Sequence, residues 1–197
     1  MILASQSPRR RELIQLLKQK VDFQSSNVDE SLVIETCKKE GKTSPEELVM
    51  ALSAAKAADV AGSHPGNLVI GADTIVVLDD EILGKPKDKE EARLFLHRLC
   101  GREHLVLTAV TLQKDHKSHS FVETSRVEFF ELSKESENFI ESYLESGAPM
   151  DKAGAYGIQD EGALLVKGIH GDFYNVMGLP IARLWRELQA FNSGKTI

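Results

Sequence analysis

The chain has 197 residues and a formal net charge of −6, with 42% hydrophobic and 27% charged residues, an ordinary globular composition. Its acidic balance and its aromatic content of 6% argue against a nucleic-acid-binding protein, which needs a basic face and stacking rings. No apolar stretch approaches the ~20 residues that span a bilayer, and the N-terminus lacks the long apolar region of a signal peptide. Because Cys37 and Cys100 show no metal-ligand spacing and fit a reducing compartment, we expect a cytoplasmic protein without membrane contact.

The first predicted elements are a strand over residues 2–5 and a helix over residues 8–20. Ser7 suits the cap of this helix, and Pro8 suits its first position. Three consecutive arginines, residues 9–11, follow directly. Because a helix start already presents N–H groups and partial positive charge, this turn is a candidate site for a small polyanion such as a nucleoside triphosphate. The alternative is a solvated basic helix start.

The next segment, residues 21–43, is mixed and polar, and by default Glu30 belongs to a solvated loop there. A helix then begins at Ser44, which is followed by a proline and, three residues later, by Glu47. Lys56 lies at the edge of the apolar stripe of this helix. A lysine at such an edge usually lays its stem on the core and keeps its charge in water.

Residues 67–79 form an apolar, β-rich run that suits a strand covered on both faces, and Gly71-Ala72-Asp73-Thr74 interrupts it. A carboxylate in such a strand is costly unless it is paired, hydrogen-bonded or bound to a metal, so Asp73 is the best single candidate for chemistry. The alternative is an aspartate that caps a strand end or a bulge. Lys85 follows in the turn Gly84-Lys85-Pro86 and is either a directed charge or an ordinary exposed lysine.

The remaining predicted elements are a helix over 88–101, strands over about 104–113 and 119–131, a helix over 133–145, a strand over 164–169, a turn over 175–180 and a helix over 180–191. The last helix is expected to bury Ile181, Leu184, Trp185 and Leu188. Between them, residues 147–163 are rich in glycine and alanine and predict an irregular loop that passes close to a ligand. Gln159 is functional only if this loop contacts the ligand. The alternation of strands and helices predicts an α/β or α+β fold with a mixed sheet, in a single domain over 1–197.

Eight short segments carry a resemblance that no single one would support: Leu3–Arg10, Val28–Glu30, Ala54–Ala57, Gly71–Thr74, Gly84–Pro86, Thr108–Val110, Asp151–Gln159 and Gly178–Pro180. In their order and their spread over nearly the whole chain, they resemble the Maf family of nucleoside triphosphate pyrophosphatases. The segments Ser-Pro-Arg-Arg, Gly-Ala-Asp-Thr and Lys-Ala-Gly-Ala-Tyr-Gly-Ile-Gln are similar to the branch that acts on dTTP and UTP. Asp160 departs from the pattern, because the family usually has glycine after this glutamine.

The resemblance implies a long, curved, mixed sheet flanked by helices, with two lobes around a cleft (a Maf/ITPase-like fold). It also implies hydrolysis of dTTP and UTP, or of modified pyrimidine nucleotides, to a monophosphate and pyrophosphate, as housecleaning of the nucleotide pool. A homodimer is usual in the family. Two alternatives remain: a 7-methyl-GTP pyrophosphatase, and a non-catalytic regulator of septum formation in cell division.

Catalytic roles follow from the resemblance together with residue chemistry. Asp73 is predicted to act as the general base on the attacking water and to bind a divalent metal, with Glu30 as a second metal ligand. Mg²⁺ or Mn²⁺ suits such carboxylates and phosphate oxygens. Lys56 and Lys85 are predicted to neutralise the charge that builds on the bridging and leaving oxygens.

Substrate-binding roles are carried over in the same way. Arg9 and Arg10 are predicted to bind phosphates, because the planar guanidinium matches phosphate oxygens. Ser5 and Thr74 are predicted to donate to phosphate or to hold their neighbours in place. Gln159 is predicted to read the base or to hold the ligand loop.

Overall fold

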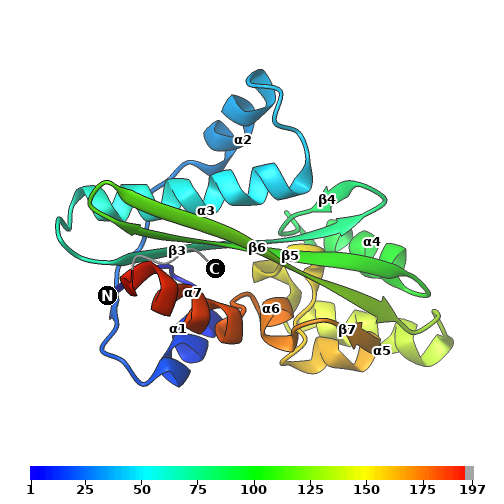
Figure 1. Cartoon of the computed structure of the whole chain (residues 1–197). Coiled ribbons are helices and arrows are strands. Elements are labelled where there is room, and N and C mark those ends of the chain that lie inside the picture. The colour runs from blue at the N-terminus through cyan, green and yellow to red at the C-terminus, as the bar shows by residue number, and fades with distance from the viewer. Residues whose placement is uncertain (194–197) are drawn as a thin grey trace. The chain divides into compact units, whose positions relative to one another are not determined.

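The structure is a computed structural model and describes residues 1–193 (Figure 1). The described strands form a seven-stranded sheet in the order β2-β1-β3-β5-β6-β7, with β4 paired to β3. The strands are β1 (Ile2–Ala4), β2 (Asp22–Phe23), β3 (Val69–Leu78), β4 (Glu81–Leu83), β5 (Glu103–Lys114), β6 (Lys117–Phe129) and β7 (Val166–His170). Since β1 pairs parallel with β2 and β3, while β4 and β7 pair antiparallel with their neighbours, the sheet is mixed, as the sequence predicts.

Helices flank this sheet, so the mixed α/β class is confirmed. The α-helices are α1 (Pro8–Ile14), α2 (Glu30–Lys39), α3 (Pro45–Gly62), α4 (Lys89–Leu99), α5 (Lys134–Glu145), α6 (Phe173–Met177) and α7 (Ile181–Ser193). The short 3₁₀ helices are η1 (Gln15–Leu17), η2 (Ala148–Asp151), η3 (Ala153–Ala155) and η4 (Glu161–Leu165). Within residues 1–193, no helix combines the length and the apolar character that crossing a membrane requires.

The chain divides into two compact units, each of which is described by itself. The first unit contains residues 1–74, residues 108–123 and the described residues from Gly178 on, and the second unit contains residues 75–107 and 124–177. Strands β3, β5 and β6 contribute residues to both units. That residues 1–197 form a single domain stays a prediction.

In the first unit, the start of the chain folds as the sequence predicts. The buried strand β1 lies between β2 and β3, and Ser7 caps α1 by accepting a hydrogen bond from the Arg10 amide. The predicted helix over 8–20 is wrong at its end. The α-helix stops at Ile14, and after η1 the backbone of Lys18 turns left-handed at φ 51°.

One other prediction in the first unit is wrong. The polar segment 21–43 contains helix α2, which is capped by the side chain of Asp29, so Glu30 is a helical residue and not a loop residue. Strand β3 runs through residues 71–74, so the strand predicted over 67–79 is confirmed, and Asp73 lies within it rather than at a strand end. Helix α3 packs on β1 and α2 packs on α3 (Figure 1). The capping box at Ser44, with Glu47 as its partner, is confirmed.

The second unit has its own core of side chains from β3, β4, β5, β6, α4, α5 and the loop after α5, including Leu83, Leu96, Phe129, Tyr143 and Tyr156. The predicted helices α4 and α5 begin at their expected caps, Asp88 and Ser133. The predicted turn over 175–180 overlaps helix α6, and β7 begins two residues late because η4 precedes it.

One core prediction on the last helix fails. Helix α7, in the first unit, buries Ile181, Leu184 and Leu188 as expected, but Trp185 lies half exposed. The buried face instead includes Glu187 and Phe191.

Candidate active site

The first unit brings three predicted site residues into direct contact. The Lys56 Nζ lies 2.7 Å from Glu30 Oε1 and 2.5 Å from Asp73 Oδ1, and we call these three residues the Lys56 cluster. The side chains of Lys56 and Asp73 are each 12% exposed, whereas that of Glu30 is 52% exposed. The buried carboxylate of Asp73 therefore has a counter-charge, as its position in an apolar strand requires.

Gly71 explains how Lys56 reaches Asp73. A Cβ atom on Gly71 would lie 2.3 Å from the Ser53 carbonyl oxygen and 2.7 Å from the Ala57 amide nitrogen, so the backbone of α3 rests directly on β3. Alternate residues of a strand share a face, so Asp73 points to the same side as Gly71. Lys56, one residue before Ala57, is thereby placed over the carboxylate.

The short strand β1 ends before it reaches the level of Asp73. Strand β1 ends at Ala4, which pairs with Gly71, so Asp73 and Thr74 lie beyond the end of β1 along β3. At this point the chain turns through Ser5 into α1. The carboxyl end of a parallel strand next to a helix start is a common place for a ligand in α/β proteins.

The side chain of Arg10 is held by two hydrogen bonds to segments outside α1. Its Nε donates to the Gly178 carbonyl oxygen and its Nη2 donates to Thr74 Oγ1, both at 2.8 Å. The Thr74 hydroxyl lies 2.9 Å from the hydroxyl of Thr108. Burial lowers the pKa of Arg10, and the negative charge of Asp73 opposes this shift. The guanidinium therefore interacts electrostatically with the carboxylate of the Lys56 cluster.

The other residues of the turn differ in what they do. Ser5 is buried, and its hydroxyl accepts from the Ser7 amide at 3.1 Å. Arg11 donates to the Ser5 carbonyl oxygen through Nε and Nη2, both at 3.2 Å, and its guanidinium lies over the Phe23 ring. Arg11 therefore holds the turn. Arg9 lies half-buried beside Arg10 on α1.

The second unit holds the two remaining predicted residues, Lys85 and Gln159, and both are exposed. Their segments are joined, because the Gly154 amide donates to the Gly84 carbonyl oxygen at 3.1 Å. The structure thus links the Lys85 turn to the Gln159 loop within one unit. That both act on the same ligand as the Lys56 cluster stays a prediction.

The sequence reading missed a second lysine cluster, in the predicted ligand loop. Lys152 Nζ lies 2.8 Å from Asp151 Oδ1 and 3.2 Å from Asp160 Oδ2, and its side chain is 9% exposed. We call these three residues the Lys152 cluster. Nothing in the glycine- and alanine-rich sequence signals that this lysine is buried. Asp160 was noticed only as a departure from the family pattern.

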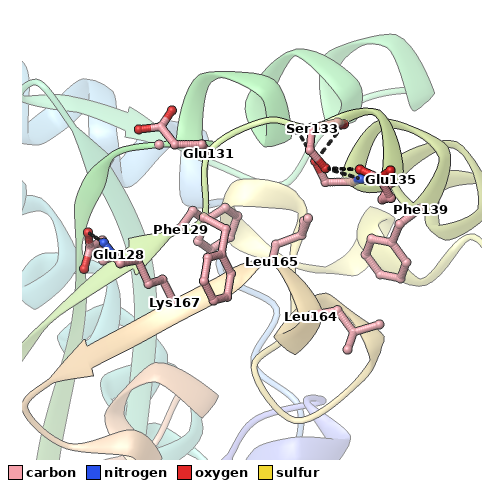
Figure 2. Close-up of a pocket in the computed structure, with 12 residues that line it drawn as sticks. Glu128, Phe129, Glu131, Ser133, Glu135, Phe139, Leu164, Leu165 and Lys167 are labelled. Atoms are coloured by element: carbon pink, nitrogen blue, oxygen red, sulfur yellow. Dashed lines mark hydrogen bonds and ion pairs between the residues drawn. The ribbon is translucent and has the colours of Figure 1, made fainter.

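A pocket of about 570 Å³ also lies in the second unit (Figure 2). Phe139 from α5 and Leu164 from η4 lie on one side of it, and the ion pair of Lys167 with Glu128 lies on the other. Its described lining includes no predicted site residue.

Among residues 1–193, no group of three or more histidine, cysteine, aspartate or glutamate side chains is arranged to hold a metal ion. In the candidate active site, two carboxylates, those of Glu30 and Asp73, share Lys56. Two carboxylates are the usual protein contribution to a Mg²⁺ ion that also binds substrate phosphates.

A parallel strand that ends at an arginine-rich turn, beside carboxylates held by a lysine, is typical of α/β proteins that bind phosphorylated ligands. Residues 1–191 match the family model described as Maf-like protein, so the chain belongs to the Maf family. Its curated relatives include a dTTP/UTP pyrophosphatase of Bacillus velezensis, 50% identical over 98% of this chain and 96% of the relative. Proteins of the same name from Bacillus cytotoxicus and a Geobacillus species are each 47% identical, over 98% and 96% of this chain and 96% of each relative.

Proposed function

We propose that this chain hydrolyses dTTP and UTP to the nucleoside monophosphate and pyrophosphate with the help of a divalent cation. The Lys56 cluster is the observation that carries the proposal, because it places a nearly buried aspartate next to a cation, beyond the point along β3 where the parallel strand β1 ends. The names of the relatives support the choice of substrate over 7-methyl-GTP.

Asp73 is the proposed general base, which accepts a proton from the water that attacks phosphorus. Lys56 holds this carboxylate in one orientation through the 2.5 Å contact. The same ammonium group is positioned to share its charge with phosphate oxygens when the nucleotide enters, since its other partner, Glu30, is half exposed.

The proposed cation site consists of Glu30 and Asp73, whose oxygens are the ligand type that Mg²⁺ and Mn²⁺ prefer. When bound, the cation neutralises phosphate charge and polarises the bond that breaks. Because the two carboxylates contact Lys56, cation binding and the position of Lys56 are coupled in this proposal.

Arg9 and Arg10 are proposed to bind the phosphates. The bonds of Arg10 to Gly178 and Thr74 fix the plane of its guanidinium before any ligand arrives, which lowers the entropy cost of binding. Ser5 is proposed to shape the same turn.

From the second unit, Lys85 is proposed to neutralise the leaving pyrophosphate and Gln159 to contact the base. We also propose, from the family resemblance, that the protein is a homodimer.

A nucleotide panel tests the proposal. Pyrophosphate release from dTTP, UTP, CTP and 7-methyl-GTP is measured with Mg²⁺, with Mn²⁺ and in excess EDTA. We expect dTTP and UTP to be the best substrates and EDTA to stop the reaction. Asp73→Asn should lower kcat by about 10²- to 10⁴-fold, the usual contribution of a general base, with an unchanged circular dichroism spectrum. Preference for 7-methyl-GTP, or full activity of Asp73→Asn, would contradict the proposal.

A further inference from the structure

The carboxylate of Asp160 is engaged on both oxygens. Its Oδ1 accepts from the Tyr143 hydroxyl and from the Gly162 amide, both at 2.9 Å, and its Oδ2 lies 3.2 Å from Lys152 Nζ. The side chain is 28% exposed. The negative charge that this residue adds to the loop is therefore matched by a cation of the same loop.

Lys152 is itself held from several sides. Besides Asp160, its ammonium group donates to the Ala148 carbonyl oxygen and to Asp151 Oδ1. A buried lysine needs such partners, because an unpaired ammonium in a core is strongly destabilising. Asp160 is thus one of two carboxylates that contact Lys152 and hold it in place.

Tyr143 ties the loop to helix α5. Its ring is fully buried in the core of the second unit, and its hydroxyl accepts from the Gly157 amide at 3.2 Å while it donates to Asp160. Burial and the charge of Asp160 raise the pKa of Tyr143, so the hydroxyl keeps the proton it donates. Asp160 is therefore bonded to a fixed point of the core.

Packing around the carboxylate is tight. A Cβ atom on Gly157 would lie 2.4 Å from Asp160 Oδ2 and 2.7 Å from Lys152 Cε, and a Cβ atom on Gly162 would lie 2.9 Å from the Tyr143 hydroxyl. Residues 152–162 are thus closed around the side chain of Asp160. The chain has little room to adopt another arrangement while these contacts persist.

We propose that Asp160 is a positioning residue, which fixes residues 152–162 so that Gln159 and, through the Gly154–Gly84 hydrogen bond, the Lys85 turn are preset for the nucleotide. Gln159 directly precedes Asp160 and is exposed, so the orientation of its backbone depends on these contacts. This inference rests on the proposed function, because it assigns a role in binding the same substrate.

The alternative hypothesis is that the negative charge of Asp160 repels the triphosphate. Two substitutions distinguish this hypothesis from a positioning role. Asp160→Asn removes the charge and the ion pair with Lys152, which keeps Asp151 and the Ala148 carbonyl group as partners, but it retains an oxygen that accepts from Gly162 and Tyr143. Asp160→Gly removes the whole side chain. If Asp160 has a positioning role, the KM of Asp160→Asn for dTTP should stay within about twofold of wild type. The KM of Asp160→Gly should be about tenfold higher if only about a tenth of the molecules have the loop in the binding-competent conformation. Repulsion predicts that Asp160→Asn lowers KM, most strongly at low salt.

In both variants, kcat should stay within about twofold of wild type, since the reacting groups are untouched. Tyr143→Phe removes the hydroxyl that joins Asp160 to α5 but keeps the ring, and it should raise KM in the same direction, which provides a second variant if Asp160→Gly folds poorly. Glu161→Gln is the matched control: it neutralises an exposed neighbouring carboxylate and should leave KM unchanged.

Hydrogen exchange of the Gly157 and Gly162 amides gives a readout that is independent of activity. We expect faster exchange in Asp160→Gly and Tyr143→Phe than in wild type and Glu161→Gln. Unchanged exchange in both variants would overturn the proposal, and so would faster exchange with an unchanged KM, because Asp160 would then act on structure alone. If wild type hydrolyses no nucleotide, the proposed function fails, while the exchange rates still decide whether Asp160 holds the loop.

Discussion

Each unit contains a nearly buried lysine, and in both cases the ammonium group requires anionic partners because it is largely removed from water. Lys56 meets Glu30 and Asp73, which belong to two other elements, α2 and β3. Lys152 meets Asp151 and Asp160, which belong to its own loop, and also a backbone carbonyl group. The first cluster depends on the packing of distant segments, and the second is assembled locally.

The difference in exposure separates the roles that the two clusters can play. Glu30 is 52% exposed, so we expect that a ligand can approach the Lys56 cluster from this side and exchange partners with it. In the Lys152 cluster, the more buried carboxylate, Asp160, is bonded on both oxygens to the protein. We therefore expect the same pair of residue types to serve ligand chemistry in the Lys56 cluster and loop structure in the Lys152 cluster.

The largest expected effect comes from removing each lysine in turn. Lys56→Met should lower kcat by about 10²- to 10³-fold, the usual loss when one preorganised electrostatic contact is removed. Lys152→Met should lower the free energy of unfolding by about 2–3 kcal/mol, less than the 3–5 kcal/mol of a fully buried pair because Asp160 keeps some contact with water. Lys152→Met should also raise the KM for dTTP with little change in kcat.

The measurements are steady-state kinetics with dTTP and urea unfolding of both variants. The comparison fails if Lys152→Met lowers kcat as strongly as Lys56→Met does. It also fails if Lys56→Met leaves kcat intact, because the lysine would then serve only the stability of the first unit.

The sequence predicts those parts of the site whose signal lies in a few neighbouring residues. Asp73 stands out because a carboxylate interrupts an apolar strand, and the structure supplies the partner that this position demands. The start of α1 and the capping box of α3 follow from Ser7 and Ser44, whose side chains bond to amides three residues later. The roles of Lys85 and Gln159 came from the family resemblance, because an exposed lysine or glutamine carries no local signal.

The sequence does not predict features that depend on contacts between distant segments. Helix α2 was missed because its apolar residues, 32–34 and Cys37, are few and lie among polar and charged residues, although Asp29 is a recognisable N-cap. The burial of Lys152 was missed because its partners lie in a loop without periodicity. The contact of Gly71 with α3 was invisible for the same reason, since a glycine in a strand indicates a close approach without naming what approaches.

A smaller effect tests whether packing sets the geometry of the Lys56 cluster. In Gly71→Ala, the new methyl group would meet the Ser53 carbonyl oxygen, so α3 must move away from β3. We expect the free energy of unfolding to fall by about 1–3 kcal/mol, as in other overpacked cores. Because Lys56 moves with the helix, kcat/KM should fall by about tenfold or more.

Gly62→Ala is the matched control at the end of the same helix. A Cβ atom at Gly62 would meet no atom within 4 Å, so this variant should be unchanged or more stable by up to about 1 kcal/mol, as is usual for alanine in helices. Both variants are compared by thermal unfolding and kinetics. If Gly71→Ala behaves like Gly62→Ala, the contact between α3 and β3 does not position Lys56.

The smallest expected effect concerns the hydrogen bond between His104 and Tyr156, a residue of the loop that contains the Lys152 cluster. His104 Nε2 lies 2.8 Å from the Tyr156 hydroxyl, both side chains are buried, and burial lowers the pKa of His104 to about 3. An unfolded histidine titrates near pH 6.5, so between about pH 6.5 and pH 3 the unfolded chain binds a proton that the folded chain does not. The free energy of unfolding must therefore fall as the pH falls through this window.

Between pH 7.5 and pH 5.5, this one group should lower the free energy of unfolding by about 1.4 kcal/mol, since the lower value lies one unit below the unfolded pKa. His104→Gln should remove this part of the pH dependence even if it is less stable at both pH values. His116→Gln, at an exposed position between β5 and β6, should keep it. Urea unfolding of the three proteins at both pH values gives the slopes. Equal slopes for wild type and His104→Gln would mean that His104 is also protonated in the folded protein, so that its contact with Tyr156, like the Lys152 cluster, would involve a charged group.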